Sequence, residues 1–153
     1  ASTPVIIKEE VRFVNAQERN QKQQALLAFV ELWKRAWESD DVEHYLSFYS
    51  EKFRTGGSTY KSWAKRKRVL NKRIEQRKIH ISDLSILESK NVVHVRFVQD
   101  YSSSNITDIG MKELFITQEN GQYKIISENW SRLKSPQPAT LQYAYQDSEE
   151  SAL

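Results

Sequence analysis

The spacing of the apolar residues changes abruptly near residue 78, and this change limits the fold more than any other feature of the chain. Before it, apolar side chains recur every three or four positions, as on one face of a helix. After it, apolar and polar residues alternate, most clearly over residues 93–101, which is typical of a strand with one buried face. The sequence therefore predicts helices followed by an antiparallel sheet, an α+β plan.

Three helices are expected before this change, over residues 15–38, 41–50 and 60–77. Asn15 is a possible N-cap of the first helix. A Ser-Asp-Asp break separates the first helix from the second, and Ser39 or Asp40 is predicted to cap the second one. The glycine pair within residues 55–59 predicts a turn before the third helix.

The alternation predicts a meander of strands after residue 78. The shift between the Ile79, Ile81 pair and the Leu84, Ile86 pair indicates a bulge in the first strand. Asn120-Gly121 predicts a tight hairpin turn. The residues expected on the inner face of the sheet are Val93, Val95, Phe97, Gln99, Tyr101, Lys112, Ile126, Glu128 and Trp130.

Composition limits the class of protein further. A chain of 153 residues suits one domain, expected at 15–133, with an extended arm or linker at 1–14 and a polar, acidic tail at 134–153. The absence of cysteine excludes disulfides, thiolate zinc sites and cysteine nucleophiles. We expect no transmembrane segment, because no apolar run is long enough. No basic-then-apolar leader opens the chain, and its Ala-Ser-Thr-Pro start could be a mature end left after cleavage.

The net charge of +3 hides a basic segment. Residues 61–78 hold nine Lys or Arg and one Glu. These charges could follow a nucleic-acid backbone, meet an acidic partner domain or polyanionic envelope, or simply be solvated. They spread around the predicted helix with few aromatic residues beside them, so nucleic-acid binding is the least favoured of the three.

Six aromatic residues fall within residues 33–53, on both sides of the Ser-Asp-Asp break. Their helical spacing favours a simple aromatic core. However, four of them (Trp33, Trp37, Tyr45 and Tyr49) carry a polar group that needs a partner when buried, and such groups often line a cavity.

The ordered motifs of this chain resemble a nuclear transport factor 2-like (NTF2-like) domain. They are Phe29-x-x-x-Trp33-x-x-x-Trp37-Glu38-Ser39-Asp40-Asp41, Tyr45-Leu46-x-Phe48-Tyr49-x-x-x-Phe53, Trp63 with Lys65 to Arg68, Phe97-x-Gln99-x-Tyr101, Asp108-x-Gly110-x-Lys112-x-Leu114 and Glu128-x-Trp130. Together they resemble the branch found as an accessory domain of bacterial L,D-transpeptidase or L,D-carboxypeptidase-like envelope proteins. The resemblance implies three helices packed in a curved sheet that forms a cone, with a pocket at its wide end.

The resemblance and the inner face of the sheet together predict a ligand pocket. Its expected residues are Trp37, Tyr45, Tyr49, Trp63, Lys67, Gln99, Tyr101, Lys112, Glu128 and Trp130. Aromatic walls with cationic and amide tips suit a small anionic ligand or a peptide fragment. Lys112 and Glu128 could instead form a structural ion pair, and both interpretations stay open.

No catalytic group, cofactor or metal site is expected. Enzymes of this superfamily place Asp or an Asp and His pair inside the cone, whereas His44, His80 and His94 all fall off the inner faces here. The favoured function is a non-catalytic ligand- or protein-binding module of the bacterial cell envelope, associated with peptidoglycan-modifying machinery.

Two other functions stay open. One is a small-molecule dehydratase or isomerase with Glu128 as its acid/base, and the less favoured one is nucleic-acid binding through the third helix. A cell-wall enzyme domain and a second copy of the chain, paired through the outer face of the sheet, are possible partners. The periplasm or cell envelope is the expected location, and the cytoplasm is the alternative.

Overall fold

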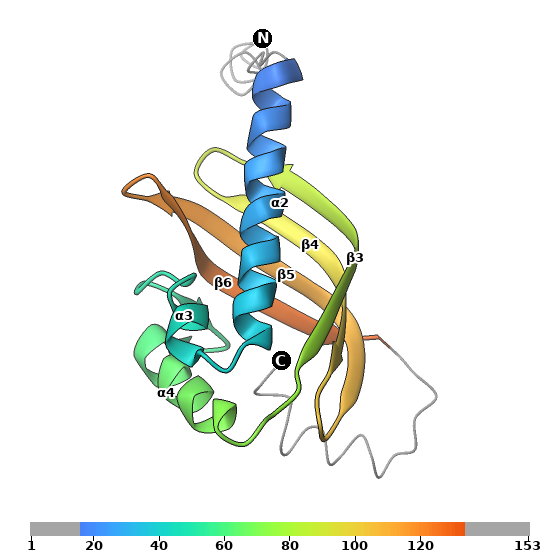
Figure 1. The fold of residues 1–153 in the computed structure, drawn as a ribbon. Coiled ribbons are helices and arrows are strands. Elements are labelled where there is room, and N and C mark those ends of the chain that lie inside the picture. Colours follow the sequence, from blue (N-terminus) through green and yellow to red (C-terminus); the bar gives the residue numbers. More distant parts are fainter. Residues whose placement is uncertain (1–15, 134–153) are drawn as a thin grey trace. The chain divides into compact units, whose positions relative to one another are not determined.

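The computed structural model describes residues 16–133. The chain divides into two units between Glu31 and Leu32, which are described separately. The first unit is the beginning of helix α2 (Ala16–Glu38), and the second holds the rest of α2 and every other element (Figure 1). The predicted arm, the possible N-cap Asn15 and the predicted tail lie outside the described residues.

The break between the first two helices is formed by side-chain hydrogen bonds. Ser39 Oγ donates back to the carbonyl of Ala36 at 2.6 Å, at the end of α2. The next helix, α3 (Val42–Leu46), is capped by Asp41, whose carboxylate accepts from His44 N at 3.1 Å. The predicted caps Ser39 and Asp40 are therefore wrong by one or two positions, because Ser39 bonds to the preceding helix.

Both α3 and the following helix end earlier than predicted. Helix α3 stops at Leu46 because the next residues pair with a distant strand: Ser50 N donates to Ile125 O, and Ile125 N to Phe48 O, each at 2.9 Å. Helix α4 (Tyr60–Asn71) stops six residues before the predicted end at 77. Gln76 has a φ of 57°, a left-handed conformation that no α-helix continues through.

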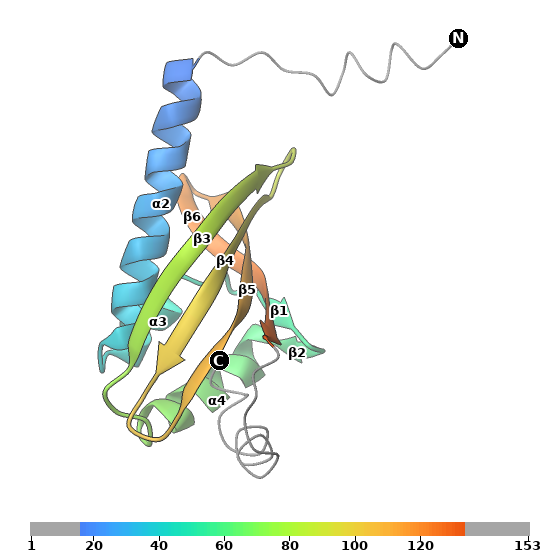
Figure 2. The same ribbon diagram turned by 90° about the vertical axis from the view of Figure 1, so that its right-hand side faces the viewer.

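Among residues 16–133 the sheet has four antiparallel strands in the order β3-β4-β5-β6, with β3 and β6 at its edges, and it is not closed there. The strands are β3 (Lys78–Glu88), β4 (Val93–Ser102), β5 (Thr107–Glu119) and β6 (Gln122–Arg132). Figure 2 shows their strong curvature. Strands β1 (Arg54–Thr55) and β2 (Ser58–Thr59) form a separate two-residue hairpin around the predicted glycine turn.

The predicted turn and bulge are confirmed. Asn120 and Gly121 have φ values of 52° and 78°, which fit a two-residue hairpin turn between β5 and β6. The register of β3 against β4 shifts between Ser82 and Ser85. A second shift, between Phe115 and Ile116 on β5, was not predicted.

The predicted inner face is confirmed with one correction. Val95, Phe97, Gln99 and Tyr101 of β4 are fully buried, while Arg96 and Asp100 are exposed. On β6 Ile125 is buried in place of the predicted Ile126, which is half-buried. The unpredicted shift explains this, because Ser127 pairs with Phe115 and Ile125 with Ile116, which leaves Ile126 between them without a partner in the pairing.

No helix within residues 16–133 combines the length and the apolar character that crossing a membrane requires.

The first prediction concerns Gly110 of β5. A Cβ atom at this position would lie 2.5 Å from the carbonyl oxygen of Ser131 and 2.6 Å from the Trp130 ring, so β6 has to move to accept it. We expect Gly110→Ala to lower the free energy of unfolding by about 1–3 kcal/mol. Urea unfolding measures this, with Asn129→Ala at an exposed position of β6 as the control. An unchanged unfolding midpoint in Gly110→Ala would contradict the packing.

Candidate functional site

The aromatic side chains form a continuous buried layer against the inner face of the sheet. Trp33 Nε1 donates to the Tyr49 hydroxyl at 3.0 Å, and that hydroxyl lies 3.0 Å from the hydroxyl of Tyr45. The ring of Trp63 packs 4.4 Å from that of Tyr49. The polar tips of Trp33, Tyr45 and Tyr49 are therefore satisfied by one another, and these rings belong to the core.

Lys112 and Glu128 form an ion pair inside this layer. Lys112 Nζ lies 2.6 Å from Glu128 Oε2, and the two side chains are 1% and 9% exposed. Lys112 Nζ also lies 5.3 Å from the ring centroid of Trp37 and 5.8 Å from that of Trp130, within range of cation–π attraction. The structural ion pair that was one of the two interpretations of Lys112 and Glu128 is therefore present.

The charge of Glu128 is stabilised by its neighbours. Burial alone raises the pKa of a carboxyl group, but the charges of Lys112 and Lys67 outweigh burial and lower the pKa of Glu128 below its ordinary value. Burial, followed by the charge of Glu128, raises the pKa of Tyr45 and Tyr49 well above 10. At neutral pH the carboxylate is therefore charged and both phenols are neutral.

Lys67 is a second buried cation on the same layer. It lies on α4, is 6% exposed, and its Nζ is 5.8 Å from the Trp37 ring centroid and 5.7 Å from that of Trp63. Burial lowers the pKa of Lys67 to about 7. The charge of Glu128 opposes this shift, while the charges of Lys112, Arg77 and Arg66 add to it.

Gln99 and Trp130 complete the layer. Gln99 is fully buried, and neither atom of its amide has a hydrogen-bond partner among the described residues. The indole Nε1 of Trp130 also lacks one there. Buried polar groups are nearly always paired, so these three atoms mark a place where the polar interior is incomplete.

All ten residues predicted for the pocket gather on this one layer. A cleft of about 10 Å³, lined by Trp37, Val42, Tyr45, Lys67, Leu70, Asn71 and Arg77, opens beside it. This volume is about what a single water molecule needs. Wider hollows of about 450 and 480 Å³ lie on the surface beside Lys52 and Glu119.

Sequence reasoning missed Arg77. It is 7% exposed and lines the same cleft as Lys67. In the sequence it stands at the end of the basic segment, where a surface charge is the usual interpretation. The one available signal was its place two residues before Ile79, at the start of the alternating pattern.

The histidines lie away from this layer, as predicted. His44 and His80 are exposed. His94, on the outer face of the sheet, lies 2.6 Å from Glu113 and stacks on Phe115 with ring centroids 4.7 Å apart. Within residues 16–133, no group of three or more His, Asp or Glu side chains is placed to hold a metal ion.

A curved antiparallel sheet with helices and a polar aromatic layer on its inner face defines an NTF2-like domain. Residues 25–129 match the family model described as the Cds6 C-terminal NTF2-like domain. The chain belongs to this family. The resemblance inferred from the motifs is thereby confirmed, and so is the fold class.

Solved structures agree. Bd1075 of Bdellovibrio bacteriovorus is 36% identical with a TM-score of 0.73, covering 80% of this chain and 46% of that one. The helical cell shape determining protein Pgp2 of Campylobacter jejuni is 32% identical with a TM-score of 0.62, covering 68% and 39%. This chain thus spans less than half the length of either protein.

More distant structures show the fold alone. An NTF2-like protein of unknown function from Pseudomonas putida is 9% identical with a TM-score of 0.67, covering 76% of this chain and 90% of that one. Among curated protein sequences, none matches this chain significantly.

The second prediction follows from the lowered pKa of Lys67. The unfolded chain holds a proton on this side chain up to about pH 10.5, whereas the native protein loses it near pH 7. Stability from this group therefore rises with pH between these values, by about 1.4 kcal/mol per pH unit at most. In Lys67→Met this rise is absent. The free energy of unfolding of the variant is therefore highest, relative to that of wild type, below pH 7.

Urea unfolding of both proteins from about pH 6 to pH 9 measures this difference. We expect the free energy of unfolding of wild type to gain on the order of 2 kcal/mol over that of Lys67→Met between about pH 7 and pH 9. Lys65→Met, at an exposed position of α4, should follow wild type in parallel. Parallel curves for Lys67→Met as well would show that Lys67 keeps an ordinary pKa.

Proposed function

We propose that this domain is a non-catalytic ligand- or protein-binding module that works beside peptidoglycan-modifying machinery in the bacterial cell envelope. Its similarity to a helical cell shape determining protein supports this assignment. So does the partial coverage of both relatives above 30% identity, because an accessory domain covers only part of a longer chain. A periplasmic or envelope location follows from the same proposal.

The state of the buried carboxylates carries the non-catalytic part of the proposal. Glu128 is paired with Lys112, and Asp108 accepts from Arg132 Nε at 2.6 Å and from Ile109 N at 2.9 Å. A general base must reach a substrate proton and have a pKa near the working pH. The pKa of Glu128 is lowered away from the working range and its carboxylate is held by Lys112, so proton transfer of the dehydratase kind is disfavoured.

The same interior suits recognition. Its aromatic walls are buried and pack against one another, so little side-chain entropy remains to be lost when a ligand docks. Three cations (Lys67, Arg77 and Lys112) against one carboxylate (Glu128) favour an anionic partner. A small anionic ligand or peptide fragment is therefore the proposed ligand, and a cell-wall enzyme domain the proposed protein partner.

The third prediction tests binding against turnover. Soluble peptidoglycan fragments should bind to the domain in calorimetry and be recovered unchanged by mass spectrometry after long incubation. Purified peptidoglycan should likewise retain the domain in a sedimentation assay. Steady conversion of a fragment that Glu128→Gln abolishes would instead place the protein among the enzymes, and failure of every fragment and of whole peptidoglycan to bind would remove the proposed function.

The fourth prediction is a homodimer formed through the outer face of the sheet. This face carries a mixed set of half-buried side chains, with Val98 paired across the strands to Met111 and His94 to Phe115. Mixed surfaces of this kind suit a two-fold interface in which the same patch meets itself.

Light scattering should give the mass of a dimer for wild type and of a monomer for Val98→Asp. Glu75→Ala, at an exposed site off the sheet, serves as the control. A wild-type monomer at high micromolar concentration would remove this interface.

A further inference from the structure

The cleft beside Lys67 brings together two buried cations. Lys67 comes from α4 and Arg77 from the segment just before β3, and both line the cleft with Trp37 and Tyr45. Both cationic side chains are more than nine-tenths buried. The like charges of Lys67 and Arg77 repel each other, and the charge of Glu128 offsets part of this repulsion at Lys67, so a further anion between the two cations would stabilise the arrangement.

Arg77 is the stronger sign of a missing anion. Across residues 16–133 no hydrogen bond or ion pair connects its guanidinium to another group. Lysine can lose its proton when it is buried, but the guanidinium of arginine stays charged. A buried arginine therefore needs a negative partner, and its planar fork fits a carboxylate through two parallel hydrogen bonds.

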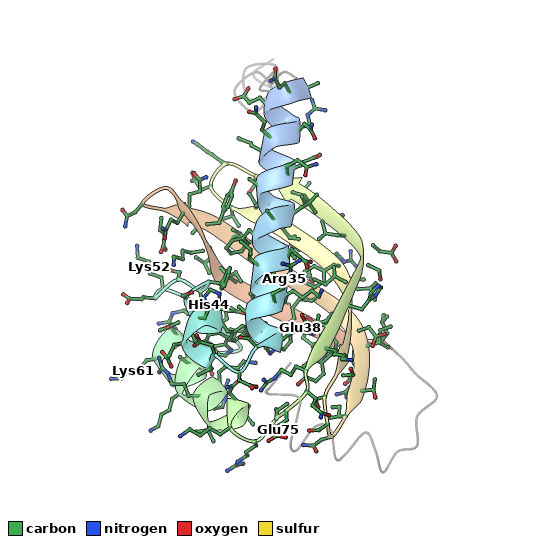
Figure 3. The ribbon with its side chains drawn as sticks, in the orientation of Figure 1. Arg35, Glu38, His44, Lys52, Lys61 and Glu75 are labelled. Carbon is green, nitrogen blue, oxygen red and sulfur yellow. The ribbon has the colours of Figure 1, made fainter. Side chains whose placement is uncertain are left out.

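The protein's own carboxylates nearby are already engaged. Glu128 is paired with Lys112. Glu38, at the last turn of α2 (Figure 3), accepts a hydrogen bond from Ile79 N at 2.9 Å. Neither forms an ion pair with Arg77. The negative partner of Arg77 is therefore expected to come from outside the described chain.

We propose that Arg77 and Lys67 form a carboxylate-binding subsite in this cleft, and that its occupant is the terminal carboxylate of an amino acid or peptide. This inference rests on the proposed function and names the part of the ligand that the domain recognises. The apolar group next to the carboxylate lies against Trp37 and Tyr45. A single bidentate contact with Arg77 and one bond from Lys67 would satisfy both oxygens.

The size of the cleft decides how much of the ligand enters. About 10 Å³ has room for one water-sized group, so an oxygen of the carboxylate enters the cleft and a whole peptide does not. The remaining part of the ligand lies outside, near Leu70 and Asn71 at the end of α4. The carbonyl of Leu70 already accepts from Arg73 N at 3.0 Å and Ile74 N at 3.1 Å, so it does not turn an unpaired oxygen toward an incoming anion.

Binding at this subsite takes up a proton. In the free protein burial lowers the pKa of Lys67 to about 7, and an incoming carboxylate raises that pKa because it stabilises the ammonium form. The charged groups that act on Lys67 include Glu128 on β6, Lys112 on β5, Arg77 before β3 and Arg66 on α4, and Tyr45 on α3 lines the same cleft. Glu128 stays charged and Tyr45 neutral across this range, so the linked proton belongs to Lys67.

Calorimetry with defined probes tests the subsite on the protein as it stands. The probes are N-acetyl-D-alanyl-D-alanine, its C-terminal amide, and free D-alanine. We expect the acid to bind at least about tenfold more tightly than the amide. Equal binding of D-alanine and the blocked dipeptide would assign the carboxylate to a free amino acid, and preference for the dipeptide would assign it to a peptide end.

Variants and pH separate the two cations. Arg77→Gln should lower the affinity for the acid probe at least about tenfold. Arg73→Gln, at an exposed position nearby, should leave this affinity unchanged. Wild-type affinity should fall about tenfold or more from about pH 6.5 to pH 8.5, whereas Lys67→Met should bind weakly with little change over this range. Calorimetry in buffers of different ionisation enthalpy should show proton uptake in wild type near pH 7.5 and none in Lys67→Met.

The outcomes distinguish this inference from the proposed function. Peptidoglycan fragments that bind equally well as acid and amide would overturn the subsite and leave the binding function standing. The acid and amide probes use wild-type protein, so this result does not depend on whether Arg77→Gln folds. Failure of the acid to bind at pH 6.5 while whole peptidoglycan still retains the domain would also overturn the subsite alone.

Discussion

The ion pair between Lys112 and Glu128 holds the interior of the second unit together. It joins neighbouring strands, and the Lys112 ammonium also lies between the rings of Trp37 and Trp130. Trp37 belongs to the last turns of α2, so this one cation connects a helix to two strands. Removing one partner of a buried ion pair typically costs about 3–5 kcal/mol, because the remaining charge loses its nearest opposite charge. Trp130, which packs over Gly110, also lies within cation–π range of Lys112.

A second consequence of this pair is that the charge of Glu128 is shared: it is paired with Lys112 and also acts on Lys67, and it forms no ion pair with Arg77. Folding alone would favour an apolar residue at either position, since well-packed hydrophobic replacements of buried charges are often neutral or stabilising. Local rules that are broken without compensation tend to mark functional sites. The incomplete hydrogen bonding of Gln99, fully buried on the neighbouring strand, points the same way. Together these features separate the cleft from an ordinary core.

The elements and their inner faces could be predicted from the sequence because each follows from local periodicity. Alternation placed Phe97, Gln99 and Tyr101 inside, and helical spacing placed Lys67 there. The end of α3 was predicted wrongly because a distant strand determines it. Ile125 forms backbone hydrogen bonds with Phe48 and Ser50, and local helix propensity does not reveal this pairing. The burial of Arg77 was not predicted for a related reason. Its burial is set by the left-handed turn at Gln76 and the packing of α4 beside it, and neither is visible in a run of basic residues.

The protonation states of the interior decide which functions this NTF2-like fold can host here. The same fold serves unrelated chemistries, so the argument must come from the site. The neighbours of Glu128 push its pKa down and burial pushes the pKa of Tyr45 and Tyr49 up, which moves these groups away from proton exchange at neutral pH. Burial lowers the pKa of Lys67 to about 7, so this ammonium group does exchange its proton at neutral pH. It is well suited to a site whose charge is completed when an anion arrives, because ligand and proton then bind together.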